Sequence, residues 1–491
     1  MRDGVLSFLL AITFAFVAQA QTFPIPVLSG DYPDPTILRD GDDFYMTHSP
    51  CHYPPGFLIW HSKDLLNWKP INRALAQWSG SAWAPDLVKH EGKYYIYYPA
   101  AGSNFVIWTD NIRGKWSEPI DLKIRGIDPG HIVGEDGKRY LFLSNGYVVE
   151  LTEDGLATAG QSEKVYAGWR YPREWVTECM CLESPKLIKY GDYFYMTSAQ
   201  GGTAGPATSH MAISARSKSI KGEWENSPYN PIVHTYSDSE NWWSKGHGTL
   251  IDDASGNWWI VYHAYAKDFH TLGRHTLIEP IEWTEDGWFR LKKSHSGQGW
   301  GNPIKQNTEE FLSDNFGDER LGLQWTFWKE FAPESISIAQ NTLTLKAKGT
   351  TPADARLLLA TAADKVYETQ VEISLEEGNG AGLILFYNEK AFAGIVADEK
   401  SLTVYKDADT NTVIPNPFGN HVFLKIINTG NLCAFLASQD NRTWKILAEK
   451  VDVSGMHHNI HKGFYALRIG LLSTGAGAAR LADFRYQIPT K

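Results

Sequence analysis

From Tyr32 to Tyr265 the chain repeats one pattern of apolar and polar positions. A segment with Pro or Gly leads into a short apolar strand, a turn with Gly, and a strand dense in aromatic residues. Because Gly supplies the backbone angles of tight turns, each repeat predicts a β-hairpin. The five repeats are YPDPTILRDGDDFYMTHS from Tyr32, WAPDLVKHEGKYYIYYPA from Trp83, GIDPGHIVGEDGKRYLFLS from Gly126, LESPKLIKYGDYFYMTSA from Leu182 and KGHGTLIDDASGNWWIVYHAY from Lys245.

The spacing of these hairpins indicates how they assemble. Their anchor residues Pro35, Pro85, Pro129, Pro185 and Gly248 are 50, 44, 56 and 63 positions apart. A four-stranded propeller blade takes about 40 to 50 residues. The sequence therefore predicts a five-bladed β-propeller in which the rest of each period supplies two further strands. The competing interpretation is an array of β-sandwiches with coincidental hairpins.

A propeller would bring distant residues together, because the first strand of every blade lines the central channel. At the start of that strand the five repeats place Asp34, Trp83, Asp128, Glu183 and His247. Flanking Pro and Gly residues would end the strand there and fix the backbone. We therefore expect three carboxylates to meet at one channel mouth.

Grouped carboxylates beside Trp and His suit acid–base hydrolysis of a glycoside. One protonated acid supplies the leaving group's proton, while a carboxylate activates water on the opposite face. In an inverting enzyme the two lie ~6.5 to 9.5 Å apart, and a third acid can raise the proton donor's pKa. An Asp before Pro also caps turns, so the hypothesis depends on all three repeats together.

The same motifs resemble glycoside hydrolase family 43 over about Pro24 to Leu291. The resemblance is carried by PDP with GDDFYM, WAPDL, IDP with EDGKRYL, ESPKL, and LGRHTLIEPIEWTEDGW from Leu272. It implies inverting enzymes on a five-bladed propeller, chiefly β-xylosidases, α-L-arabinofuranosidases and arabinanases.

The resemblance also implies roles for individual residues. Asp34 would be the general base and Glu183 the general acid, while Asp128 would orient that acid and adjust its pKa. Trp83 would form part of the sugar platform, and Arg274 would hold sugar hydroxyls. Ser184 follows Glu183 where many members have Gly.

His247, in GHGTL, matches a channel histidine that in many members lies near a bound calcium or a water. No cofactor would be required for catalysis, and a calcium ion at this place would be structural. A packed, hydrogen-bonded histidine is the alternative interpretation.

Other acids near these motifs are weaker candidates. Glu174 and Glu178 are alternative proton donors, but neither occupies the repeated position, and Asp31 is the weaker candidate base. Asp86 is expected to cap or pair locally. In AGWRYPREWVTECMCLESP, the aromatic and basic side chains that would shape the pocket are Trp169, Arg170, Arg173 and Trp175.

The repeat ends after residue 292, and residues 293–310 are rich in Gly, Ser and Asn, which predicts a linker. From Phe311 to the C-terminus, short alternating strands at regular spacing predict an antiparallel β-sandwich. Its start, FLSDNFGDERLGLQWTFW, resembles the concanavalin-like domain that follows the propeller in β-xylosidase-type members. There it can lend a loop to the active-site rim, and a purely stabilising role is the alternative.

Residues 1–20 combine Arg2, a short apolar run and Ala-Gln-Ala, which predicts a signal peptide and a catalytic domain from residue 21 to 292. The protein is then secreted or periplasmic, with no membrane span. The four cysteines do not suggest a disulfide scaffold. Cys179 and Cys181, one residue apart, are expected to be buried thiols, with Cys51 as the alternative partner of one.

The charge composition narrows the range of expected binding partners. The 46 Lys and Arg against 56 Asp and Glu give a net charge of −10 and contain no long basic run, which argues against nucleic acid. The leading hypothesis is an exported, exo-acting glycosidase that releases xylose or L-arabinofuranose from plant cell-wall polysaccharides or oligosaccharides. The alternatives are a glycosidase acting on galactose or galactofuranose, and a non-catalytic glycan-binding propeller.

Overall fold

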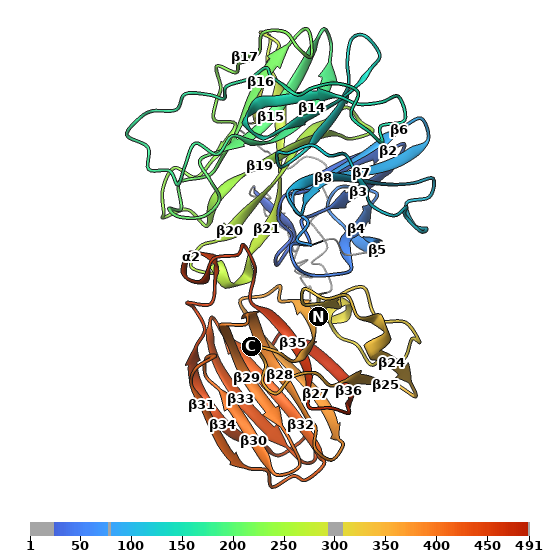
Figure 1. The fold of residues 1–491 in the computed structure, drawn as a ribbon. Helices are drawn as coiled ribbons and strands as arrows, with labels where there is room; N and C mark the ends of the chain where they lie inside the picture. The colour runs from blue at the N-terminus through green and yellow to red at the C-terminus, as the bar shows by residue number, and fades with distance from the viewer. Residues whose placement is uncertain (1–23, 77–79, 293–307, 490–491) are drawn as a thin grey trace, which may run out of the picture.

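The structure, a computed structural model, describes residues 24–76, 80–292 and 308–489. It has two β-rich parts that lie end to end (Figure 1). The predicted five-bladed propeller followed by a β-sandwich is confirmed. The predicted signal peptide, residues 1–20, and most of the predicted linker lie outside the described residues.

Four blades are antiparallel sheets that contain one hairpin repeat each, and the strands run outward from the channel in chain order. Blade one has β2 (Thr36–Asp40), β3 (Asp43–Thr47), β4 (Gly56–Ser62) and β5 (Lys69–Leu75). Blade two has β6 (Asp86–His90), β7 (Lys93–Ala100), β8 (Ser103–Thr109) and β9 (Ile120–Asp121). Blade three has β10 (Gly130–Val133), β11 (Arg139–Leu143), the 3-10 turn η1 (Ser144–Gly146), β12 (Tyr147–Glu150) and β13 (Glu163–Lys164). Blade four has β14 (Glu183–Tyr190), β15 (Tyr193–Gln200), β16 (Met211–Ser217), β17 (Glu225–Asn226) and β18 (Val233–His234).

The fifth blade joins the two ends of the propeller. It contains β19 (Trp242–Asp252), β20 (Trp258–Ala266), the turn η2 (His270–Leu272), β21 (Arg274–Trp283) and β22 (Phe289–Leu291). The outer edge of β21 also pairs with β1 (Ile25–Leu28), the first strand of the propeller. The ring therefore closes through backbone hydrogen bonds between its first and last strands, and Arg274 begins the strand that β1 holds.

The second part consists of two seven-stranded antiparallel sheets packed face to face. The first sheet has the order β23 (Thr326–Phe327), β26 (Arg356–Thr361), β35 (Arg468–Thr474), β28 (Gly380–Asn388), β29 (Ala391–Ala397), β30 (Ser401–Tyr405) and β31 (Asn411–Pro415). The second has the order β24 (Ile336–Ala339), β25 (Thr342–Lys346), β36 (Ala478–Gln487), β27 (Val366–Leu375), β32 (His421–Thr429), β33 (Leu432–Ser438) and β34 (Trp444–Asp452). Alternating apolar side chains of both sheets form one core.

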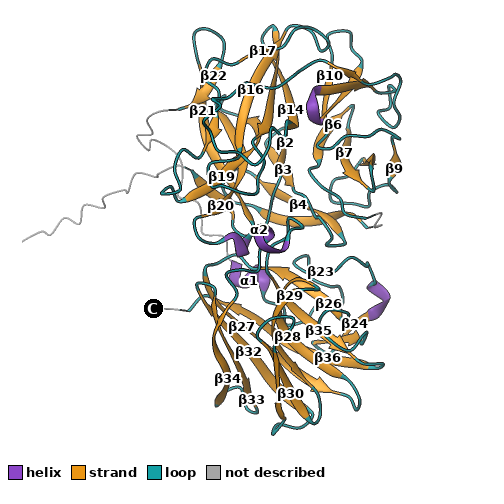
Figure 2. Ribbon diagram, turned by 60° about the vertical axis from the view of Figure 1, so that its left-hand side comes forward, coloured by secondary structure: helices purple, strands orange, loops and turns teal. Residues whose placement is uncertain are grey.

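The two parts meet through short segments at one end of the sandwich. Figure 2 shows α1 (Thr308–Leu312) and α2 (His458–His461) between them, while the turn η3 (Pro333–Ser335) precedes β24. Backbone bonds cross the boundary from Phe327 N to Pro54 O at 2.7 Å and from Leu467 N to Thr271 O at 2.8 Å. Within the described residues, no helix is both long and apolar enough to cross a membrane.

The prediction for two cysteines is wrong. The structure joins Cys179 to Cys181 in a disulfide, whereas Cys51 and Cys433 are buried free thiols. The Cα atoms of the bonded pair are 5.3 Å apart, which is within the range that disulfides need. Met180, between the two cysteines, has an exposed side chain.

Because β1 closes the ring, the loss of a buried side chain from β1 should destabilise the propeller. Leu28 on this strand is fully buried, so Leu28→Ala should lower the free energy of unfolding by about 2 to 5 kcal/mol. Pro26→Ala is the matched control because Pro26 is exposed on the same strand. Urea titration of both variants measures the difference, and equal losses would contradict this account of closure.

Candidate active site

Each inner strand carries a residue in the left-handed backbone region, which lies just before β2, β6 and β10 and within β14 and β19. These five residues are Asp34, Ala84, Asp128, Ser184 and His247, with φ values of 56°, 25°, 56°, 53° and 59°. Such angles are uncommon for residues other than Gly and concentrate at functional sites. Asp34, Asp128 and His247 occupy this repeated position itself. Trp83 and Glu183 each lie one residue before the left-handed residue of their repeat. The expectation that all five channel residues occupy equivalent positions is therefore wrong by one residue for these two.

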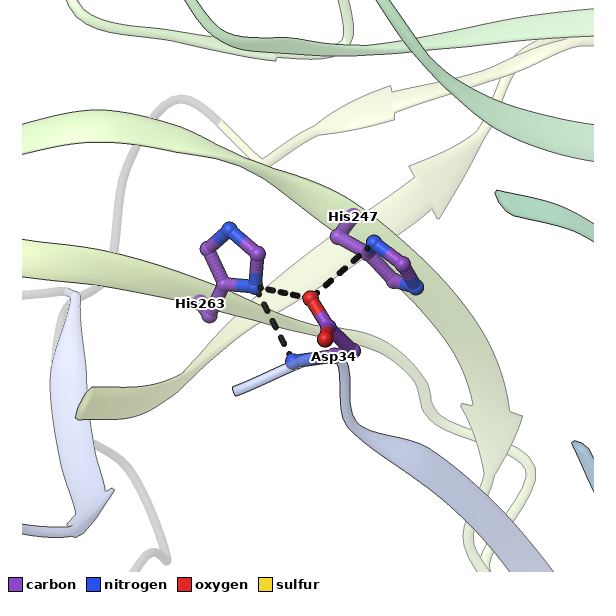
Figure 3. A group of neighbouring side chains, drawn as sticks. All are labelled: Asp34, His247 and His263. Atoms are coloured by element: carbon purple, nitrogen blue, oxygen red, sulfur yellow. Dashed lines mark hydrogen bonds and ion pairs between the residues drawn. The ribbon is translucent and has the colours of Figure 1, made fainter. Parts of the chain in front are cut away.

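Asp34 is a buried carboxylate surrounded by donors. Arg274 Nη1 donates to Asp34 Oδ1 at 2.9 Å, and Ser49 Oγ donates to Oδ2. His247 Nδ1 lies 3.4 Å from Oδ1 (Figure 3). Burial alone would raise the pKa of Asp34, but the Arg274 guanidinium holds that pKa well below its ordinary value. Asp34 is therefore negatively charged across the neutral and mildly acidic range.

His263, on β20, holds the backbone of Asp34. The Asp34 N–H donates to His263 Nδ1 at 3.0 Å, and His263 Nε2 lies 3.1 Å from Thr203 Oγ1. Burial lowers the pKa of His263 to about 4, so its ring is neutral at pH 7. With Nδ1 accepting from the Asp34 N–H, Nε2 carries the proton and donates to Thr203. Sequence reasoning missed His263, because HAY in an aromatic strand does not distinguish a channel histidine from a core one.

Asp34, His247 and His263 form the group within the described residues that could surround a metal ion, with their ligand atoms within 4.8 Å of one another. Calcium takes six to eight oxygen ligands, whereas this group offers one carboxylate and two imidazole nitrogens. Arg274 places a positive charge on the same carboxylate. These three side chains alone do not form a calcium site. His247 Nε2 has no protein partner among the described residues, so its ring lacks the full set of bonds of a packed histidine.

Asp128 and Glu183 have the opposite electrostatics to Asp34. Burial, reinforced by the charge of Asp34, raises the pKa of Asp128 to about 7, although Lys186 opposes the shift. Burial of its carboxyl, followed by the charges of Asp128 and Asp34, raises the pKa of Glu183 well above the ordinary value. The Glu183 side chain remains partly exposed, so it can reach a substrate. The site thus combines one carboxylate, Asp34, with two carboxyl groups whose pKa values are raised.

Lys186 and Asp86 form a buried ion pair inside the channel. Lys186 Nζ donates to Asp86 Oδ1 at 3.0 Å and to the carbonyls of Pro85 at 2.7 Å and Pro129 at 3.0 Å. The expectation that Asp86 pairs locally is wrong, because its partner comes from blade four. The pair fastens three inner strands just below the carboxylates. It also lines a cavity of about 640 Å³ at the other end of the channel, which none of Asp34, Asp128 and Glu183 reaches in the described structure.

The rim combines both domains. Trp83 is 38% exposed and its ring centre lies 6.4 Å from that of Phe464, which follows α2 in the sandwich. The centre of the Phe464 ring is also 5.7 Å from the Arg274 guanidinium, and His458 stacks on Phe464 with ring centres 3.7 Å apart. Phe464 has no signal in the propeller repeats, so sequence reasoning did not identify it.

The weaker candidate acids have other contacts. Glu178 Oε2 accepts from Ala204 N at 2.9 Å, and Glu174 is exposed. Asp31 Oδ1 accepts from Arg274 N at 3.2 Å and is buried away from the channel mouth. In the segment before Glu183, Trp169 and Trp175 pack with Tyr171, whereas Arg170 and Arg173 are exposed.

Two family models match the chain. Residues 23–289 match the model described as glycosyl hydrolases family 43, and residues 313–487 match the β-xylosidase C-terminal concanavalin A-like domain.

Curated relatives are similar over most of the chain. A non-reducing end α-L-arabinofuranosidase of Bacteroides ovatus is 32% identical over 70% of this chain and 69% of its own length. A xylan 1,3-β-xylosidase of a Vibrio species is 27% identical over 67% and 69%.

Solved structures share the whole arrangement. The family 43 protein XynB of Bacillus licheniformis is 27% identical, with a TM-score of 0.84 over 95% of this chain and 100% of the other. A family 43 protein of Bacteroides ovatus, from a xyloglucan utilisation locus, is 26% identical with a TM-score of 0.82 over 96% and 100%.

The raised pKa of Asp128 predicts a stability cost. An unfolded Asp titrates near pH 3.9, so between about pH 4 and pH 7 only the unfolded chain loses this proton, and folding stability falls as pH rises. Asp128→Asn should therefore be more stable than the wild type by on the order of 2 kcal/mol at pH 7.5. The gain should vanish near pH 4. Urea unfolding at both pH values measures it, and a gain that does not depend on pH would contradict the assignment.

Proposed function

Since the chain belongs to glycosyl hydrolase family 43 and is therefore a glycoside hydrolase, we propose that it is an exo-acting, inverting enzyme that releases xylose or L-arabinofuranose from plant cell-wall glycans. The relatives named above support a pentose, because one is a β-xylosidase and the other an α-L-arabinofuranosidase. The observation that carries the proposal is the opposite pKa shift of Asp34 and Glu183 at one channel mouth.

In this mechanism Asp34 is the general base. Its carboxylate is ionised at working pH, so it accepts a proton from the water that attacks the anomeric carbon. Glu183 is the general acid and donates its proton to the departing oxygen. Burial, the negative charge of Asp128 where that group is ionised and the negative charge of Asp34 together oppose ionisation of Glu183 and keep it protonated.

The remaining polar residues hold the sugar and the base. Arg274 Nη1 fixes Asp34 Oδ1 and presents its other donors to sugar hydroxyls, while Trp83 offers an exposed ring face for stacking. Family 43 hydrolysis needs no cofactor, and no step here passes through a metal ion. The roles follow from acid, base and positioning groups of this chain alone.

Exo action is supported by the rim. Phe464 from the sandwich lies beside Trp83, and this contribution of the second domain to the rim favours a pocket that takes one terminal sugar. We also propose that residues 1–20 direct export to the periplasm or the medium, which suits polysaccharide substrates.

The test compares phenyl and 2,4-dinitrophenyl β-D-xylosides and α-L-arabinofuranosides. Asp34→Ala should lower kcat by about 10²- to 10⁴-fold on both leaving groups, because the attacking water loses its base. Glu183→Gln should lose a similar factor on the phenyl glycoside alone, because dinitrophenolate departs without protonation. Glu178→Gln is the matched control and should retain activity. The first sugar anomer released, observed by proton NMR, should have the anomeric configuration opposite to that of the substrate.

The outcomes separate the alternatives. A wild type that hydrolyses neither pentoside but cleaves a galactoside or galactofuranoside would replace the pentose assignment. A wild-type protein that binds glycans but hydrolyses none of them would support the alternative of a non-catalytic glycan-binding propeller. Retention of anomeric configuration would overturn the base role of Asp34.

A further inference from the structure

Asp31 is a buried carboxylate without a role in the mechanism above. It belongs to the segment that leads to Asp34, and its Oδ1 accepts from the backbone N–H of Arg274 at 3.2 Å. Its Oδ2 lies 3.7 Å from Nη2 of Arg468, the first residue of β35 in the sandwich. Asp31 thus lies between an active-site arginine and an arginine of the other domain.

The contact between Asp31 and the Arg274 backbone is tight. Gly273 precedes Arg274 with φ of 73°, and a Cβ added there would collide with Asp31 Oδ1. Arg274 in turn reaches Asp34 with its guanidinium at 2.9 Å. Asp31 therefore fixes the backbone of Arg274, and this backbone position allows the Arg274 guanidinium to reach Asp34.

Asp31 and Arg468 are both buried, with side chains 3% and 8% exposed. A buried charge without a partner is costly, and Arg468 is the nearest opposing charge from the sandwich. Its strand is held between β26 and β28, where Arg468 faces Thr361 and Phe386. The guanidinium lies 3.5 Å from the ring centre of Tyr53. The fold thus fixes Arg468 from both domains.

We propose that Asp31 and Arg468 are positioning residues: Arg468 balances the charge of Asp31, and Asp31 fixes the backbone of Arg274 so that its guanidinium reaches Asp34. The sandwich then acts on the reaction through a buried ion pair, in addition to forming part of the rim. The inference rests on the proposed roles of Asp34 and Arg274.

Loss of Arg468 should change the pH dependence. Burial already raises the pKa of Asp31, and Arg468 is the largest influence that opposes the rise. Without Arg468, Asp31 takes up a proton and its hold on Arg274 weakens, so the pKa of Asp34 rises toward the ordinary value. The charged or titratable groups that face Asp31 and Asp34 include Tyr32, His48, Cys51, Tyr53, Asp128, Glu183, His210, His247, His263, Tyr265, Arg274, Tyr387 and Arg468.

The experiment is a double-mutant cycle with Arg468→Met and Asp31→Asn, read as kcat/KM against pH on the faster phenyl glycoside. Arg468→Met should lower kcat/KM roughly tenfold at pH 5 and move the acid limb to higher pH. Arg468→Lys should keep most of the wild-type kcat/KM and most of the wild-type position of the acid limb. In the Asp31→Asn background, Arg468→Met should add little, because the charge that it balanced is gone.

Arg73→Met is the matched control. Arg73 is a partly buried arginine at the same domain boundary, but its guanidinium donates to the carbonyls of Leu323 and Pro55. It should lower the melting temperature and leave the pH profile of the wild type.

An Arg468→Met enzyme that has the wild-type pH profile and differs only in melting temperature, as Arg73→Met does, would overturn the positioning role. So would fully additive effects of Arg468→Met and Asp31→Asn. Failure of the proposed function is recognised separately, because it appears as an inactive wild type before any substitution is made.

Discussion

Three carboxyl groups gathered at one buried channel mouth cannot all carry a charge. Arg274 resolves this conflict by binding one of them: it stabilises the ionised form of Asp34, and the resulting negative charge raises the pKa of Asp128 and Glu183. Chemically similar groups thus acquire different protonation states from their surroundings alone. The difference is what acid–base cleavage of a glycosidic bond requires.

The fold supplies the backbone for this arrangement. Each of the five inner strands has a left-handed residue just before it or within it, and the buried Lys186–Asp86 pair fastens three of these strands beneath the site. His263 receives the N–H of Asp34, so the base is held through its main chain as well as its carboxylate. Contacts from several blades offset the strain of the left-handed residues.

Much of this was predictable from the sequence, because each blade repeats a local signal. The Gly turns and aromatic strands identified five hairpins, and their spacing identified the propeller and the channel residues Asp34, Asp128 and Glu183. The missed contacts join segments far apart in the chain: His263 is 229 residues from Asp34, and Lys186 is 100 from Asp86. Local patterns do not encode such pairings. Trp83 and Glu183 lie one position before the left-handed residue of their repeats. The sequence did not reveal this offset, because the repeated Pro and Gly residues align the strands but do not specify which neighbouring residue faces the channel.

The central claim concerns where protons lie, so the most direct measurement is neutron diffraction from a deuterium-exchanged crystal of the wild type at about pD 6. The account predicts deuterium on the Glu183 carboxyl group and none on Asp34, with Arg274 donating to Asp34 Oδ1. Deuterium on Asp34, or a bare Glu183, would contradict it.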